Sequence, residues 1–281
     1  MTPPLNSPAL KAHSVFRALT IAGSDPSGGA GIQADLKTFS ALGTYATTVI
    51  TALTAQNTQG VTGVHLVPAP FVTSQLEVLV ADVRIDTIKI GMLANAEIIE
   101  AVTAFLSTHH YPFVVLDPVM VATSGDPLLA AAAVQSLRAL IPRASIITPN
   151  IDEAAALLGL APAETVAEMI DQAQALLALG AQRVLLKGGH LEHLTDAPDV
   201  FIDEGGVTVL TLPRIRTRNT HGTGCSLSSA IAALRPQRSN WLEATRDAKK
   251  WLSGALAAAD SLEVGSGRGP VHHFFDVWDA R

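Results

Sequence analysis

A glycine-rich segment near the end of the chain, Thr220-His221-Gly222-Thr223-Gly224-Cys225, runs directly into a helix-forming stretch of small residues. A glycine-rich turn that enters a helix leaves backbone N–H groups unpaired and directs them the same way, with the positive end of the helix dipole behind them. The segment therefore predicts an anion site in which Gly222, Thr223 and Gly224 are donors. Cys225 would lie at its rim, where this field favours thiolate over thiol. The alternative is a tight turn whose cysteine packs as a small apolar side chain.

Carboxylates follow two of the predicted strands. Asp117 comes directly after a strand at 113–116, and Glu153 follows a strand at 145–148. Two carboxylates at neighbouring strand ends can share a Mg²⁺ through waters, because Mg²⁺ usually keeps several water ligands. The alternative for Glu153 is structural, since Asn150 and Glu153 also have the spacing of a helix capping box.

A lysine follows another predicted strand. Lys187 ends the apolar run at 183–186 and precedes two glycines that allow close approach of a ligand. A cation at this place suits nucleotide phosphates, and a solvated lysine is the alternative. An anion site, a candidate Mg²⁺ pair and a lysine at a strand end together indicate phosphoryl transfer from a nucleotide.

The first strand is followed by a glycine-rich loop that matches the dinucleotide pattern only in form. The segment Gly29–Ala34 fits G-x-G-x-x-[GA], but no acidic residue for a ribose occurs between Asp35 and Glu77. The P-loop pattern is absent from the sequence as well.

Asp35 is either a functional acid or a solvated carboxylate on a helix. Gln56, in a run of amides and hydroxyls, either recognises the edge of a heteroaromatic ring or belongs to a polar turn.

Short β-branched runs alternate with longer helical segments, which indicates a parallel sheet with helices on both faces. Strands are predicted at 17–22, 47–51, 87–90, 113–116, 145–148 and 183–186. Helices are predicted at 31–42, 70–82, 95–108, 127–140, 152–159, 165–179, 224–234 and 241–261. Strands at 200–202 and 207–210 form an antiparallel hairpin at the sheet edge. No linker divides the chain, so a single domain, 17–281, follows a flexible tail, 1–16.

The composition of the 281 residues narrows the class of protein. Hydrophobic residues make up 48% of the chain, the net charge is −6, and no basic run provides a footprint for nucleic acid. The single cysteine excludes an internal disulfide and suits a reducing compartment. No run of 18 apolar residues predicts a membrane span, and the Pro-rich N-terminus does not resemble a signal peptide. We expect a cytoplasmic protein without a membrane or nucleic-acid partner.

Taken in order, these motifs resemble those of the hydroxymethylpyrimidine/phosphomethylpyrimidine kinases of thiamine biosynthesis. The resemblance covers about residues 17–276. The segments that carry it are Ala18–Gln59, Lys89–Leu93, Val115–Met120, Ser124–Leu129, Ile147–Asn150, Leu186–His190, Asn219–Cys225 and Gly269–Phe274.

The resemblance implies a ribokinase-like α/β fold of three layers, with a mostly parallel central sheet and antiparallel edge strands. It implies two ATP-dependent steps, in which 4-amino-5-hydroxymethyl-2-methylpyrimidine becomes its monophosphate and then its diphosphate. The implied pyrimidine contacts are Gly23, Asp35, Gln56, Met92 and Val119. The implied ATP-binding residues are Lys187, Asn150 and Thr220, and the implied Mg²⁺ ligands are Asp117 and Glu153. The implied catalytic residues are Cys225, Gly222, Thr223 and Gly224.

Two other functions stay open, a pyridoxal kinase of the same fold and a catalytically silent vitamin-binding protein. The family resemblance also implies a homodimer. The chain departs from the family pattern in the loop Val264–Gly269. Some family members have a lysine there, whereas this chain has only Arg268 as a cation. His272 and His273 lack a neighbouring carboxylate or cysteine cluster, so we expect packing or hydrogen bonding from them instead of metal binding.

Overall fold

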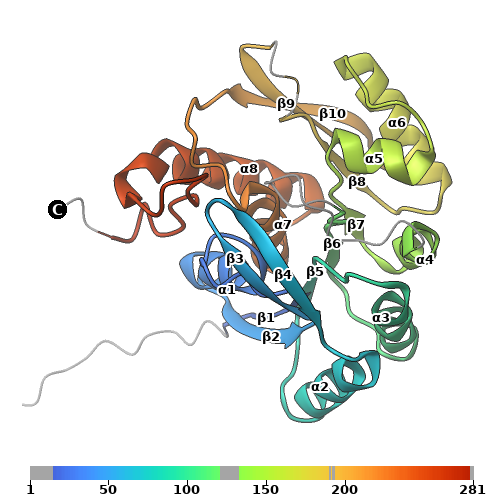
Figure 1. Ribbon diagram of the computed structural model, residues 1–281. Helices are drawn as coiled ribbons and strands as arrows, with labels where there is room; N and C mark the ends of the chain where they lie inside the picture. Colours follow the sequence, from blue (N-terminus) through green and yellow to red (C-terminus); the bar gives the residue numbers. More distant parts are fainter. Residues whose placement is uncertain (1–14, 121–132, 190, 192–193, 279–281) are drawn as a thin grey trace, which may run out of the picture.

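The computed structural model describes residues 15–120, 133–189, 191 and 194–278. Within them, one sheet of eight strands has the order β10-β9-β8-β7-β6-β5-β1-β2 (Figure 1). Its strands are β1 (Arg17–Ala22), β2 (Tyr45–Ile50), β5 (Thr87–Ile90), β6 (Val114–Leu116), β7 (Ile146–Ile147), β8 (Val184–Lys187), β9 (Asp196–Asp203) and β10 (Gly206–Pro213). The neighbouring strands β2, β1, β5, β6, β7 and β8 run parallel to one another. β9 and β10 complete the edge beside β8 as an antiparallel hairpin.

Helices cover both faces of this sheet (Figure 1). The helices on one face are α1 (Gly31–Ala41), α7 (Thr223–Leu234) and α8 (Trp241–Ala257), and those on the other are α2 (Ala69–Asp82), α3 (Ala96–Thr108), α4 (Val134–Leu140), α5 (Ile151–Leu158) and α6 (Val166–Ala178). Alternate residues of β1 face opposite layers, since Leu19 and Ile21 join one apolar core and Ala18 joins the other. A parallel sheet covered on both faces requires strands that are apolar throughout, which is why these strands show no polar alternation.

A second, two-stranded sheet lies outside the main one. β3 (Ala52–Asn57) and β4 (Gly60–Leu66) form an antiparallel hairpin with a bulge between Ala55 and Gln56. The sequence predicts a polar segment around Gln56 after the second strand and does not predict this hairpin; in the structure Gln56 lies on β3. Its apolar side chains Leu53, Val64 and Leu66 are exposed, so the hairpin lacks the apolar signal of a core strand.

The predicted elements otherwise agree with the structure in type and order, although β9 and β10 are eight residues each and so longer than the strands predicted at 200–202 and 207–210. The helix predicted at 127–140 is described only from Val134, because 121–132 lie outside the described residues, as do the motif at 124–129, His190 and residues 1–14 of the predicted tail. α8 ends at Ala257, short of the predicted 261, and a 3-10 turn at Ala259–Leu262 follows it. Among the described residues, no helix is both long and apolar enough to cross a membrane.

Candidate active site

A cleft of about 1970 Å³ opens along the ends of the strands, between the β3–β4 hairpin and the N-terminus of α7. Parallel strands bring the loops that follow them to one edge of the sheet, where ligands of open α/β sheets bind. Every site residue predicted from the sequence lines this cleft except Asp35. The lining residues among them are Gly23, Gln56, Met92, Asp117, Val119, Asn150, Glu153, Lys187, Thr220, Gly222, Thr223, Gly224 and Cys225.

The N-terminus of α7 has the geometry of an anion site. Gly222 precedes the helix in the left-handed conformation, with φ 76°, and no side chain caps the helix. A Cβ atom on Gly222 would lie 1.8 Å from the carbonyl oxygen of Gly29, so only glycine fits. The helices α1, α2 and α4 also lack a side-chain cap, whereas α3, α5, α6 and α8 each have an Asn or Thr side chain as N-cap. The backbone N–H of Thr223 donates to the carbonyl oxygen of Thr220, which leaves those of Gly224 and Cys225 as the first-turn donors for a ligand in the cleft.

Cys225 lies in the first turn of α7 and is partly exposed to the cleft. The expectation of a thiolate is wrong, because burial raises the pKa of Cys225 to about 11. The carboxylates of Asp35 and Asp117 raise it further, and this outweighs Lys89 and the backbone N–H of Gly31, which favour the charged form. At neutral pH this side chain is a thiol.

Asp117 and Lys187 form an ion pair at the floor of the cleft. The Nζ of Lys187 lies 2.8 Å from Oδ1 of Asp117 and 3.9 Å from Oε2 of Glu153. The hydroxyls of Thr148 and Ser228 also donate to the Asp117 carboxylate. Burial alone would raise the pKa of Asp117, but the Lys187 and Lys89 cations hold it below its usual value. Lys187 is only 13% exposed, and it lines the cleft.

Asn150 and Glu153 form the capping box that their spacing predicts. The backbone N–H of Asn150 donates to Oε2 of Glu153, and the backbone N–H of Glu153 donates to Oδ1 of Asn150. Glu153 also lies beside the Asp117–Lys187 pair, so the structural and functional interpretations of this residue are compatible. Burial and the nearby Asp117 carboxylate raise the pKa of Glu153 to about 7, although Lys187 opposes the shift.

Asp35 is buried beneath the cleft and does not line it. The interpretation as a solvated helix carboxylate is wrong, because the side chain is fully buried. The contact with the pyrimidine stays a prediction, and it would need access that the cleft lining does not give to Asp35. Its carboxylate accepts from the Nζ of Lys89 and from the hydroxyls of Thr20 and Ser229. A helix-spacing argument could not show this, since Lys89 comes from β5 and Ser229 from α7. Lys89 itself reaches the cleft lining, so Asp35 acts on the site through that lysine.

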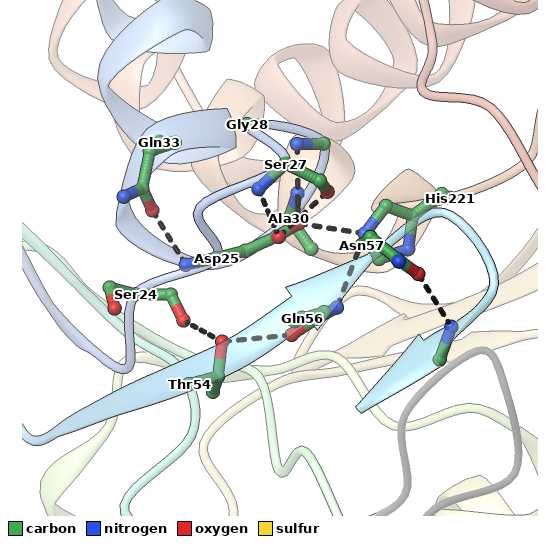
Figure 2. Close-up of polar contacts among 12 residues, drawn as sticks. Ser24, Asp25, Ser27, Gly28, Ala30, Gln33, Thr54, Gln56, Asn57 and His221 are labelled. Atoms are coloured by element: carbon green, nitrogen blue, oxygen red, sulfur yellow. Dashed lines mark hydrogen bonds and ion pairs between the residues drawn. The ribbon is translucent and has the colours of Figure 1, made fainter. Parts of the chain in front are cut away.

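Gln56, on β3, lies beside a pair that the sequence analysis did not assign. The Nε2 of His221 lies 2.7 Å from Oδ2 of Asp25 and 3.4 Å from the side-chain nitrogen of Gln56 (Figure 2). The other carboxylate oxygen of Asp25 accepts from the backbone N–H and the hydroxyl of Ser27. The only signal for these residues was their place in the two glycine-rich segments.

The tip of the β3–β4 hairpin contacts the loop before Gly269. The backbone N–H groups of Gly267 and Arg268 donate to the hydroxyl and the carbonyl oxygen of Thr58, and the amide of Gln59 donates to Ser266. Arg268 therefore lies at the rim of the cleft, as its place in the sequence suggested.

His272 and His273 have the packing and hydrogen-bonding roles expected of them. Both are buried; the His272 ring contacts Trp278, and Nε2 of His273 lies 3.0 Å from the hydroxyl of Ser226. No group of three or more ligating side chains suited to a metal occurs in the described part of the chain.

Solved structures with this arrangement of helices and strands are ribokinase-like kinases. Pyridoxal kinase from Bacillus subtilis, in its ADP complex, superposes with a TM-score of 0.87 at 35% identity, over 95% of this chain and all of that one. Phosphomethylpyrimidine kinase from Clostridium difficile 630 superposes with a TM-score of 0.76 at 40% identity, over 86% of this chain and 99% of that one. The three-layer, mostly parallel fold is thus ribokinase-like, as expected.

Sequence comparisons narrow the class further. The family model described as phosphomethylpyrimidine kinase matches residues 25–272. The hydroxymethylpyrimidine/phosphomethylpyrimidine kinase of Escherichia coli K12 is 58% identical over 94% of this chain and 99% of its own length. A thiamine biosynthetic bifunctional enzyme of Arabidopsis thaliana is 47% identical over 94% of this chain and 51% of its own. The chain belongs to the phosphomethylpyrimidine kinase family.

Proposed function

We propose that this protein is an ATP-dependent kinase that phosphorylates 4-amino-5-hydroxymethyl-2-methylpyrimidine and then its monophosphate, for thiamine diphosphate biosynthesis. One observation carries the proposal: a single cleft joins the amide of Gln56 to the Lys187–Asp117 pair and the open end of α7. The candidate ring-recognising group and the candidate phosphate-binding groups thus line one cavity. The 58% identical relatives named for this activity support it.

In the proposed reaction, Lys187 neutralises charge on the donor phosphates, and the first N–H groups of α7 stabilise the transferring phosphoryl group. Phosphoryl transfer passes through a loose transition state, so catalysis depends mainly on positioning and charge stabilisation. A protonated Cys225 thiol is a polar partner for the substrate hydroxyl. As the new oxygen–phosphorus bond forms and the bond from the γ-phosphorus to the ADP oxygen breaks, that hydroxyl loses its proton late, to an oxygen of the transferred phosphoryl group.

Asp117 and Glu153 fit a magnesium ion. They supply two carboxylates, and Mg²⁺ is held by one or two carboxylates together with phosphate oxygens and waters. A larger cluster of ligating side chains is therefore not required. When bound, the ion would neutralise negative charge on the donor phosphates. Glu153 would have to be ionised in that state.

The second candidate is a pyridoxal kinase, which the TM-score of 0.87 to the Bacillus subtilis enzyme favours. Product analysis by chromatography separates the two. With ATP, we expect mono- and diphosphate from the pyrimidine alcohol, and much slower turnover of pyridoxal. Faster turnover of pyridoxal would reverse the assignment, and no ATP consumption with any of these acceptors would favour the silent binding protein.

We further propose that the protein acts in the cytoplasm as a homodimer. Light scattering of the purified protein tests for the homodimer, because a dimer has twice the 29.3 kDa mass of the chain.

A further inference from the structure

The Asp25–His221 pair lies directly against the amide that faces the substrate cleft (Figure 2). Both side chains are nearly inaccessible, with 2% of Asp25 and 7% of His221 exposed. The imidazole ring packs on Gly29, where a Cβ atom would lie 2.4 Å from Cδ2 of His221. The backbone N–H of His221 donates to the carbonyl oxygen of Gly269, which fixes the residue from the other side. The ring is therefore held in one place.

The partner of Nε2 determines where the proton of His221 lies. Asp25 is ionised at neutral pH, because the hydroxyl of Ser27 and the backbone N–H groups of Ser27, Gly29 and Ala30 all donate to its carboxylate. Although burial raises its pKa, hydrogen bonds lower it to about 2. An ionised carboxylate can only accept hydrogen bonds. At 2.7 Å from Oδ2 of Asp25, Nε2 must therefore carry a proton, whether the ring is neutral or charged.

The direction of the Gln56 amide follows from this proton. In Figure 2 the amide nitrogen of Gln56 is on the side of His221. It lies 3.4 Å from Nε2 of His221, an arrangement that would place two N–H groups face to face. The oxygen and nitrogen of an amide have nearly the same shape, so the direction is decided by the partners. With the amide oxygen toward His221, Nε2–H can be shared between Asp25 and Gln56.

The far end of the amide supports the same direction. It lies 3.2 Å from Oγ1 of Thr54, whose hydroxyl also lies 2.8 Å from the carbonyl oxygen of Ser24. A hydroxyl has one proton to donate, and the Ser24 carbonyl can only accept. If Thr54 donates to Ser24, its oxygen is free to accept from the NH₂ of Gln56. All the polar groups of this cluster are then satisfied together.

We infer that Asp25 and His221 are positioning residues that fix the direction of the Gln56 amide, and thereby the orientation of the pyrimidine ring. This inference rests on the proposed function. The amide would present its oxygen on the His221 side and an N–H on the Thr54 side. The 4-amino group of the substrate then lies toward His221, and the ring nitrogen N3 lies toward Thr54.

This orientation agrees with the position of the anion site. The hydroxymethyl group is on C5, next to the carbon that bears the amino group. Placing the amino group toward His221 therefore carries the hydroxymethyl group to the same side, where the chain continues from His221 to Cys225. The opposite amide direction would turn the reacting hydroxyl toward Thr54 and away from α7.

The test compares two substrates with reversed ring edges. The 4-oxo analogue of the pyrimidine has a ring N–H and a carbonyl where the natural substrate has a ring nitrogen and an amino group. We expect the wild-type protein to prefer the 4-amino substrate by about 100-fold or more in kcat/KM, because a fixed amide leaves groups of the analogue unpaired. In His221→Phe, which keeps a ring but has no N–H, this preference should fall below about 10-fold. His221→Gln, which can donate to Asp25, should restore it.

A control variant and a spectroscopic measurement keep the test independent of folding. His272→Phe replaces a buried histidine outside the cleft and should keep the wild-type preference. The ¹⁵N NMR spectrum of the wild-type protein reports the protonated nitrogen of His221, whose signals are absent from the spectrum of His221→Gln. A spectrum with a protonated Nε2 supports the inference. An unprotonated Nε2, or an unchanged preference in folded His221→Phe, would overturn it. A wild-type protein that does not phosphorylate the 4-amino substrate would overturn the proposed function instead.

Discussion

The Nζ of Lys89 lies 2.9 Å from each carboxylate oxygen of Asp35, and neither side chain is exposed to solvent. The pair joins β5 to α1 beneath the cleft, and the Ser229 hydroxyl ties it to α7. Burial would lower the pKa of Lys89, but the carboxylate of Asp35 more than compensates and raises it. Lys89 therefore stays charged, and this buried charge depends on the carboxylate of Asp35 for its stabilisation.

Removal of that partner should destabilise the protein strongly. Asp35→Ala leaves a buried cation unpaired, which typically costs about 3–5 kcal/mol in the free energy of unfolding. The matched control is Asp247→Ala, because Asp247 pairs with Arg238 where both side chains are about a third exposed, and such surface pairs contribute about 1 kcal/mol or less. Urea denaturation measures both variants. Equal losses in the two would show that burial of the Lys89 pair has no energetic weight.

Cys225 should matter for the chemical step without being ionised. Cys225→Ala should lower kcat by roughly 5- to 150-fold, because loss of one hydrogen-bonding partner of a buried polar group costs about 1–3 kcal/mol. Cys225→Ser should retain more activity, because a neutral hydroxyl can replace a neutral thiol as a polar partner. Steady-state kinetics, with circular dichroism to confirm folding, checks both. Near wild-type turnover by folded Cys225→Ala would remove this residue from the mechanism.

The reactivity of Cys225 toward iodoacetamide should report its raised pKa of about 11. The thiolate is the reactive form, and a free cysteine has a pKa of about 8.5. At pH 7.5 alkylation should therefore be about two orders of magnitude slower than for free cysteine. The rate should continue to rise between pH 9 and pH 10, where free cysteine levels off. Mass spectrometry of quenched samples follows the reaction, and a plateau below pH 8 would contradict the assignment.

Lys187→Ala should impair both phosphorylations, because both steps use the same donor site. Arg268→Ala should impair the second step more than the first, since Arg268 lies at the rim of the cleft where an acceptor phosphate needs a cation. Lys250→Ala is the control, as Lys250 is exposed on α8 and away from the cleft. Chromatography scores the mono- and diphosphate separately. A Lys187→Ala protein with one unimpaired step would rule out a shared donor site.

Glu153 should make stability depend on pH near neutrality. Its pKa is raised from 4.5 to about 7 in the folded protein, so its favourable contribution is complete below pH 4.5 and is lost as the pH rises through 7. Glu153→Gln keeps the capping box and removes the titration. From pH 5 to pH 8, the variant should gain on the order of 2 kcal/mol relative to the wild type. Urea denaturation at both pH values, without Mg²⁺, measures the free energy of unfolding of the variant and of the wild type. The difference between the two proteins should change from pH 5 to pH 8, and an equal difference at both pH values would contradict the raised pKa.

The sequence predicted the sheet and its helices because both produce local patterns. Apolar runs mark the strands, and capping residues such as Asn150 mark helix starts. The cleft residues after β6, β7 and β8 were also predictable, because strand ends converge on one edge. The β3–β4 hairpin was missed because its exposed apolar residues resemble neither a core strand nor a polar turn.

The electrostatics of the site could not be predicted in this way. The charge state of Cys225 depends on burial and on two carboxylates from distant parts of the chain, Asp35 and Asp117. A helix dipole alone suggested the opposite shift. Likewise, the Asp25–His221 contact joins residues 196 positions apart, and no spacing rule relates them.

The separation of the β3–β4 hairpin from the eight-stranded sheet has a consequence for substrate exchange. The hairpin tip is held by the contacts of Thr58 and Gln59 with the loop 266–268, and these are not ladder bonds of the main sheet. Lifting the tip therefore leaves the main-sheet ladder intact. Opening of the entrance would thus require only the breaking of these few contacts, which is much less than global unfolding requires.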